Sequence, residues 1–158
     1  MRSTYKAALT VVAAVTLSTV GWGLAAATPP SGGSVTVLTR GSTGPIHDSS
    51  DDFKLYQKNA ADFVMVSYQL AAGGTLGWHT HPGPALITVT SGTLTIVEQD
   101  CSVHQYPAGS AFVDVGMGEV HDAFNEGSDT VTGYATYLNV PTGSPSRIDA
   151  EAPSCWNG

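Results

Sequence analysis

The chain has 158 residues, with six lysines and arginines against thirteen aspartates and glutamates, and a formal net charge of −7. An acidic surface of this kind repels phosphate backbones and anionic lipid, which argues against nucleic-acid binding and against a membrane-bound mature protein. The length suits one compact domain with a core of its own.

The first 27 residues are typical of a secretory signal peptide. Arg2 and Lys6 form a basic start, an apolar run follows, and small residues up to Ala27 provide a cleavage site. A membrane anchor is the alternative, but the apolar run is short for a spanning helix. We therefore predict cleavage after Ala27 and a secreted, extracellular protein that starts at Thr28.

The mature chain is predicted to be all-β, because short β-branched and aromatic runs alternate with glycine and proline turns and no ten-residue stretch has a sustained helical period. Residues 28–34 are expected to be a flexible leader, 35–140 one barrel domain and 141–158 a surface tail. Strands are expected at 35–40, 62–70, 86–90, 93–97, 111–115 and 129–140, with a loop over 41–52.

Residues 86–97 predict a β-hairpin with Ser91-Gly92 as its two-residue turn. In that register one face of the hairpin is apolar and the other carries threonines, so turn and pattern agree. Extending the pairing inward places Ala85 opposite Glu98 on the interior face.

Two histidines at alternate positions, His79 and His81, indicate a metal site. Side chains at i and i+2 of an extended strand leave the same face, so the two imidazoles are expected to point the same way. Glycines and prolines surround the pair, where the chain can turn tightly and bring backbone close to the site. The rest of the chain is expected to supply a third ligand and a barrel that holds it.

The spacing around these histidines resembles the first motif of the cupin superfamily. That motif is glycine, five residues, His-x-His, three or four residues, glutamate, six residues and glycine. Gly73, His79, His81 and Gly92 stand at the required spacings, whereas the position of the family's glutamate is occupied by Ala85.

A second cupin motif is similar in the later half of the chain. Its glycine, histidine and asparagine correspond to Gly118, His121 and Asn125, whereas the family's usual proline is replaced by Gly116. The resemblance covers about residues 62–140 and is closest to small secreted single-domain cupins of actinobacterial type.

The resemblance implies a cupin jelly-roll β-barrel with a metal in its mouth, held by His79, His81 and His121. Three neutral imidazoles also form a known first shell for zinc and suit iron, copper or nickel. We therefore expect one divalent transition metal (Fe, Zn, Mn, Ni or Cu), with a cupin that has lost its metal as the alternative. Glu98 and Glu119 are candidates to replace the missing glutamate, and a plain three-histidine face is the simpler expectation.

Two functions follow from this resemblance. A cupin with three histidines and no glutamate resembles the thiol and diketone dioxygenases, which implies a metal-dependent oxidoreductase acting on a small molecule. The alternative is a non-catalytic module that binds a metal or small ligand, because no general acid or base is obvious; a structural protein with a dead site is a third reading. No catalytic residue is assigned, and a dimer is compatible with the sequence.

Residues beside the motifs have simpler expected roles. Trp78 and Phe124 are expected to line the pocket or pack in the core, and Asn125 to tie a turn by side-chain hydrogen bonds. Export to an oxidising compartment predicts a disulfide between Cys101 and Cys155 that pins the tail to the barrel.

Overall fold

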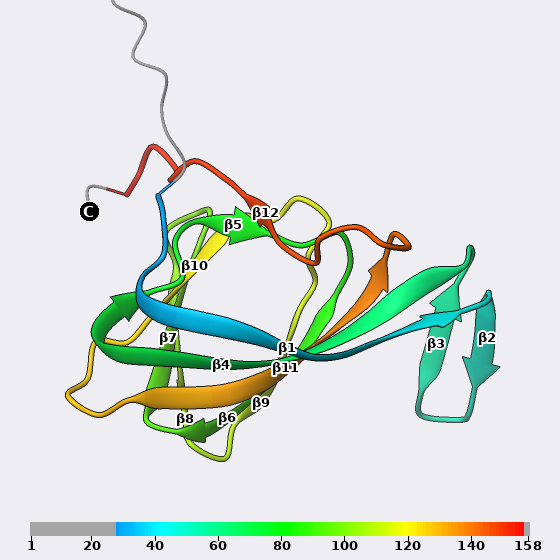
Figure 1. The fold of residues 1–158 in the computed structure, drawn as a ribbon, viewed down its shortest axis with the longest axis horizontal. Coiled ribbons are helices and arrows are strands. Elements are labelled where there is room, and N and C mark those ends of the chain that lie inside the picture. Colours follow the sequence, from blue (N-terminus) through cyan, green and yellow to red (C-terminus); the bar gives the residue numbers. More distant parts are fainter. Residues whose placement is uncertain (1–27, 157–158) are drawn as a thin grey trace, which may run out of the picture.

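The computed structural model describes residues 28–156, which form twelve β-strands and no helix (Figure 1). The expected all-β architecture is therefore confirmed, whereas the predicted signal peptide at residues 1–27 lies outside the described residues. The strands are β1 (Ser31–Thr43), β2 (Ile46–Ser49), β3 (Lys54–Gln57), β4 (Ala61–Thr75), β5 (His79–Thr80), β6 (Ala85–Ser91), β7 (Thr93–Glu98), β8 (Val103–Pro107), β9 (Ala111–Asp114), β10 (His121–Phe124), β11 (Val131–Val140) and β12 (Ile148–Asp149).

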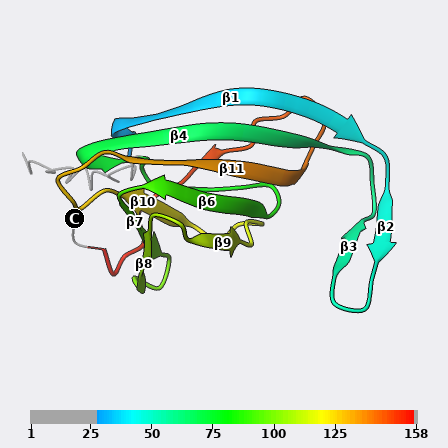
Figure 2. The ribbon, with the colours of Figure 1, turned by 90° about the horizontal axis from the view of Figure 1, so that it is seen from below.

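Ten of these strands form one antiparallel sheet that curls into a barrel. The sheet runs in the order β12-β5-β10-β4-β11-β6-β9, with β1 added to β4 and β7 joining β10 to β8. Figure 2 shows β1, β4 and β11 side by side along one wall, with β7, β8 and β9 on the opposite side. Sequence neighbours such as β6 and β7 therefore pair with different strands on different sides of the barrel, as in a jelly roll.

The core lies between these walls and is built on β4. Val64, Val66, Tyr68 and Leu70 alternate along this strand and are all buried, as the predicted period of two requires. They form one cluster with inward residues of β6, β7, β10 and β11. Burial of each aliphatic side chain contributes about 1.5–3 kcal/mol. This apolar cluster holds the sheet from which the polar site residues project.

The predicted hairpin over residues 86–97 is wrong. β6 pairs with β11 and β9, whereas β7 pairs with β10 and β8. Gly92, at φ +72°, turns the chain from one wall to the other, and its carbonyl accepts a hydrogen bond from the Ala108 amide (2.8 Å). Alternation shows which side chains point inward but not which strand lies alongside, so the pattern fits both arrangements. The pairing of Ala85 with Glu98 fails for the same reason.

Several strand ends also differ from the prediction. β1 begins at Ser31, inside the predicted leader, and runs to Thr43 because it pairs along β4. The predicted loop at 41–52 contains the end of β1 and the whole of β2, which forms with β3 a small hairpin projecting from the barrel (Figure 1). Residues 31–34 contain two glycines, and residues 41–52 are rich in glycine and aspartate, which are depleted in strands, so the sequence does not announce strands that tertiary pairing creates.

The tail, predicted to lie along the surface, contributes a strand to the sheet. β12 pairs antiparallel with β5 and places Asp149 opposite His79. The sulfur atoms of Cys101 and Cys155 are 2.05 Å apart, which is disulfide distance, as predicted. The end of the described chain is therefore attached to the barrel by a ladder and by a covalent crosslink.

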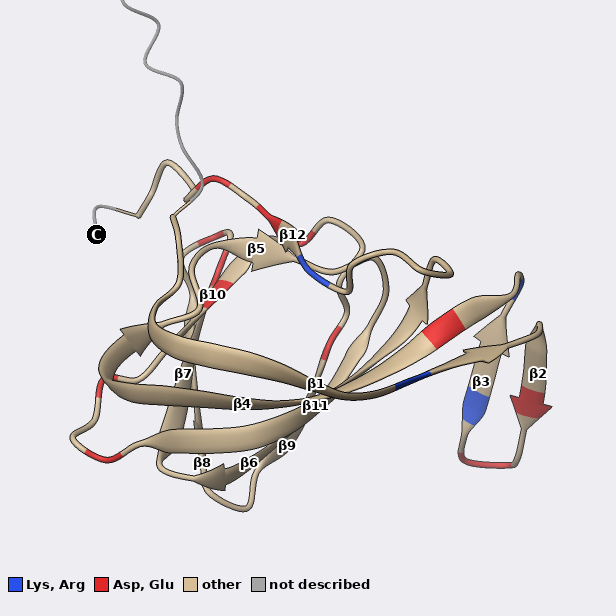
Figure 3. Cartoon of the chain, viewed as in Figure 1, with Lys and Arg blue, Asp and Glu red and all other residues tan. Residues whose placement is uncertain are grey.

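Charged side chains are scattered over the barrel, and acidic ones predominate (Figure 3). This distribution agrees with an acidity that serves solubility rather than the binding of a charged partner. Within residues 28–156, no helix is long and apolar enough to cross a membrane.

Candidate metal centre

The strands β5, β10 and β12 lie together at one end of the barrel (Figure 1). Three histidines meet there. His79 and His121 are antiparallel partners on β5 and β10, and His81 follows the end of β5. One ligand nitrogen from each ring lies within 4.8 Å of the others, and all three residues are buried. The structure thus brings together the three histidines predicted from the two motifs, in a group that could hold a metal ion.

Backbone carbonyls fix the orientation of the rings. His79 Nδ1 donates to the Gly77 carbonyl (2.6 Å), and His81 Nδ1 donates to the Ser146 carbonyl in the tail (2.7 Å). His121 also has a backbone hydrogen bond, to Glu119. A carbonyl only accepts, so the donating Nδ1 carries the proton and Nε2 keeps its lone pair for a metal.

Burial keeps the three rings neutral. Loss of solvation lowers the pKa of His79 well below its usual value and that of His81 to about 4, and it lowers the pKa of His121 in the same direction. Mutual repulsion among the rings and the charge of Arg147 add to the effect on His79. At neutral pH the rings are therefore in the form that binds metals.

One carboxylate, on Asp114 at the end of β9, also faces the histidines. Its Oδ2 lies 3.4 Å from His81 Nε2 and 3.6 Å from His121 Nε2, while its Oδ1 accepts a hydrogen bond from the Gly116 amide (2.8 Å). Asp114 Oδ2 is buried and has no hydrogen-bond partner among the described residues. The sequence reasoning missed this residue, because only the pairing of β9 with β6 brings it to the site.

The two predicted substitute carboxylates are placed differently. Glu98 is the β7 partner of His121 and is half-buried, and burial together with Asp114 raises its pKa. Glu119 is exposed. His104 is likewise exposed, on β8, outside the histidine group.

Two small cavities adjoin the histidines. One, of about 30 Å³, lies inside the barrel against all three rings and is otherwise lined mostly by apolar core residues and by Tyr137, whose ring centroid is 4.6 Å from that of His81. The other, of about 40 Å³, touches His121, Asp114 and Glu98. Volumes of this size hold one or a few water-sized molecules.

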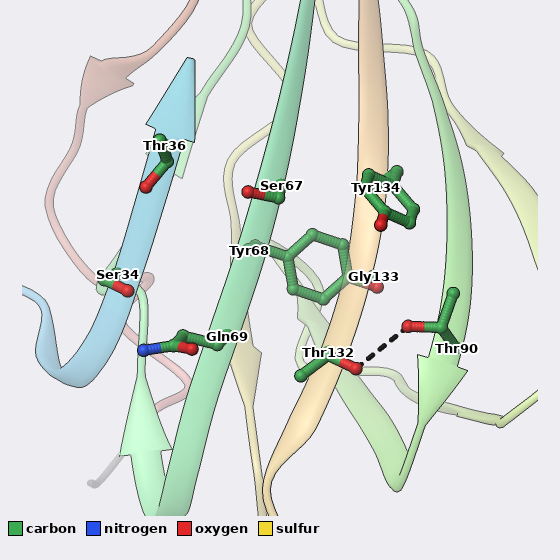
Figure 4. A pocket seen from close by; sticks show the side chains of 9 residues that line it. All are labelled: Ser34, Thr36, Ser67, Tyr68, Gln69, Thr90, Thr132, Gly133 and Tyr134. Carbon is green, nitrogen blue, oxygen red and sulfur yellow. Dashed lines mark hydrogen bonds between the residues drawn. The ribbon is translucent and has the colours of Figure 1, made fainter. Parts of the chain in front are cut away.

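A separate hollow, of about 400 Å³, lies on the outer face of β1, β4, β11 and β6. Its lining consists of serine, threonine, tyrosine, glutamine and glycine side chains, with a hydrogen bond between Thr90 and Thr132 (Figure 4). Its lining contains no histidine or carboxylate, the side chains that bind metals at the site described above.

The remaining predicted residues have structural roles. Trp78 is buried and packs edge-on against Trp156 of the tail (ring centroids 5.7 Å apart), and Phe124 packs against the same ring. The Asn125 side-chain amide donates to three backbone carbonyls, and its oxygen accepts from the Gly127 amide. The prediction that Asn125 ties a turn is therefore confirmed.

No protein-family model matches this sequence, and no curated protein matches it significantly. Solved structures do resemble it. Peruvianin-I, described as a cysteine peptidase from Thevetia peruviana latex, is 22% identical with a TM-score of 0.53, over 77% of this chain and 68% of that one. A protein with a double-stranded β-helix domain from Klebsiella pneumoniae is 23% identical with a TM-score of 0.48, over 68% and 80% of the two chains.

A cupin domain from Bordetella pertussis is 16% identical with a TM-score of 0.47, over 69% of this chain and 94% of that one. At these identities a likeness concerns the fold and not the activity. The strand order described above shows the architecture: residues 28–156 fold as a single all-β jelly-roll barrel.

Proposed function

We propose that this protein is a secreted metal-binding cupin in which His79, His81 and His121 hold one divalent transition metal. The observation that carries the proposal is the convergence of three buried, neutral imidazoles, of which His79 and His81 each donate Nδ1–H to a backbone carbonyl. The remaining ring nitrogens of the three histidines face one another, and a buried lone pair needs a partner. One metal ion can accept all three lone pairs.

A small-molecule oxidoreductase is the activity we favour for this site. Once bound, the metal would supply a Lewis acid or redox centre with positions open to a ligand. The apolar cavity of about 30 Å³ beside the rings has room for a water-sized or diatomic ligand and excludes bulk water, which suits dioxygen chemistry. A non-catalytic metal or small-ligand module is the second candidate, favoured by the absence of a carboxylate from the lining of that cavity.

The test is the metal content of protein purified from its own secretion, followed by titration of the metal-free protein with Zn²⁺. We expect about one ion per chain in the wild type. His81→Ala should lose most of it while remaining folded, because the barrel core consists of other residues. His104→Ala is the matched control, since it removes an exposed imidazole outside the group. Equal metal content in wild type and His81→Ala would overturn the site.

Oxygen uptake by the iron-loaded protein separates the two candidates. Consumption with small thiols or diketones that His81→Ala abolishes would support an oxidoreductase. Stoichiometric metal binding without uptake for any of them would support the binding module.

A further inference from the structure

We infer that Asp114 is a fourth protein ligand of the metal, supplied from β9 in place of the glutamate that the cupin pattern has at the position of Ala85. The inference rests on the metal binding proposed above and extends it by an anionic ligand from a different strand. It would make the site three histidines and one aspartate rather than a plain three-histidine face.

The strand register brings the carboxylate to the vacant position. In the β6–β9 ladder Ala85 is the direct partner of Asp114, so the two side chains leave the same face of the sheet. Ala85 is fully buried, and its methyl group offers no ligand atom. The Asp114 side chain, 12% exposed, reaches His81 and His121 from that neighbouring strand.

The distances from Asp114 to two of the three rings, those of His81 and His121, suit donors of one ion. Asp114 Oδ2 is 3.4 Å and 3.6 Å from the two Nε2 atoms. Two ligands of one tetrahedral zinc ion, each about 2.0–2.1 Å from the metal, lie about 3.3–3.4 Å apart. The atom that faces the rings is also the one without a hydrogen-bond donor among the described residues. Removing a carboxylate from water costs several kcal/mol unless a donor or cation compensates, and a divalent cation between these atoms would do so.

Gly116 explains why the carboxylate faces the histidines. Its amide donates to Asp114 Oδ1 (2.8 Å), which leaves Oδ2 pointing at the rings. Its φ of +62° and its close approach to the Gly83 carbonyl leave no room for a side chain. Proline, which the cupin pattern has here, lacks the amide hydrogen and fixes φ near −65°. The chain's two departures from the family pattern, Ala85 and Gly116, are therefore parts of one arrangement around Asp114.

The experiment measures Zn²⁺ affinity by chelator competition for wild type, Asp114→Asn and Glu98→Gln. Asparagine keeps the shape and the hydrogen bond from Gly116 but removes the anionic oxygen. We expect Asp114→Asn to weaken Zn²⁺ binding by more than about 100-fold, beyond the 10–100-fold typical of residues that only orient a ligand. Glu98→Gln removes an equal charge from the same cavity and should change the affinity by less than about 10-fold.

Two further measurements do not depend on that variant folding well. Ala85→Glu in the Asp114→Asn background should restore affinity by returning the family's ligand. In a crystal structure of the Zn²⁺-loaded wild type, Asp114 Oδ2 should lie about 2.0–2.2 Å from the ion.

The possible failures are distinguishable. If the wild type binds no Zn²⁺, the proposed function and this inference both fail. If the wild type binds Zn²⁺ and His81→Ala does not, but Asp114→Asn behaves like Glu98→Gln or Oδ2 stands away from the ion, the three-histidine site remains and Asp114 is not a ligand.

Discussion

Asp62, at the start of β4, is a buried carboxylate whose partners all belong to other segments. Arg40 and Ser42 of β1 each donate to it over 2.7 Å, and the Gly143 amide in the tail donates over 2.9 Å. These hydrogen bonds, that from Ser42 foremost, lower the pKa of Asp62 from 3.8 to about 2. The ionised Asp62 carboxylate therefore links β4, β1 and the tail, and its contribution to the stability of the fold depends on pH.

Asp62→Asn should lower the free energy of unfolding at pH 7. The asparagine side chain has one acceptor oxygen and an NH₂ donor, so it cannot accept all three hydrogen bonds that the Asp62 carboxylate accepts. The folded pKa lies below the unfolded one, so the stabilisation is present above about pH 4 and is lost as pH falls through about 2. Denaturant unfolding across this range should show the difference between wild type and variant shrinking on acidification. Asp52→Asn, at an exposed carboxylate, is the control and should show little difference at any pH.

Part of the candidate metal site could be predicted from the sequence alone. The two motifs predicted that His79, His81 and His121 would lie together, and the pairing of β5 with β10 brings them together. A carboxylate from a neighbouring strand was also considered, but Glu98 was chosen from a pairing that the fold does not contain. Asp114 could not be found this way, because its neighbours are set by tertiary pairing of β9 with β6.

At the scale of elements, β12 connects the tail to the site. It pairs with β5, and the adjacent Ser146 carbonyl accepts the hydrogen bond from His81 Nδ1. The Ala150 amide also donates to the Trp78 carbonyl (3.0 Å). The sequence predicted a tail clamped by a disulfide but not this strand, since two residues carry no readable period. The tail therefore supports a ring of the metal centre as well as covering the barrel.

Cys155→Ser should destabilise the protein by about 4 kcal/mol, because the crosslink with Cys101 closes a loop over a separation of 54 residues. It should also weaken Zn²⁺ binding by about 10-fold or more, as the tail carbonyl that orients His81 becomes less well held. Urea unfolding and chelator competition measure the two effects. Cys101→Ser should reproduce both, and the double variant should add nothing further; a larger loss in the double variant would mean that the two sulfurs act separately.

At the scale of the whole molecule, the all-β class and the inward face of β4 were readable from sequence because alternation and turn residues recur along the chain. The barrel's strand order was not, because β6 and β7 follow each other across one glycine yet lie in opposite walls. Which distant strands pair depends on how the whole barrel buries the two faces of each strand, and this cannot be read from one strand's sequence. Thr95 and Ile96, on opposite faces of β7, are both buried, which a solvent-facing hairpin would not allow.

Secretion is the prediction that concerns the whole chain. N-terminal sequencing of the exported protein should begin near Thr28, as the basic start, apolar run and small residues at Ala25 and Ala27 indicate. Titration of the denatured, unreduced protein should find no free thiol, because Cys101 and Cys155 are paired. A membrane-bound product that retains Met1 would contradict the prediction.

The hydrogen bond between the Gly116 amide and Asp114 has a consequence for sequence variation. If the carboxylate at 114 depends on a flexible residue at 116 and on a small one at 85, these three positions cannot drift independently. A proline at 116 would release the carboxylate, and a glutamate at 85 would compete with it for the same space. Homologues should therefore carry one combination or the other, and a chain changing between them would have to pass through an intermediate with a weakened site.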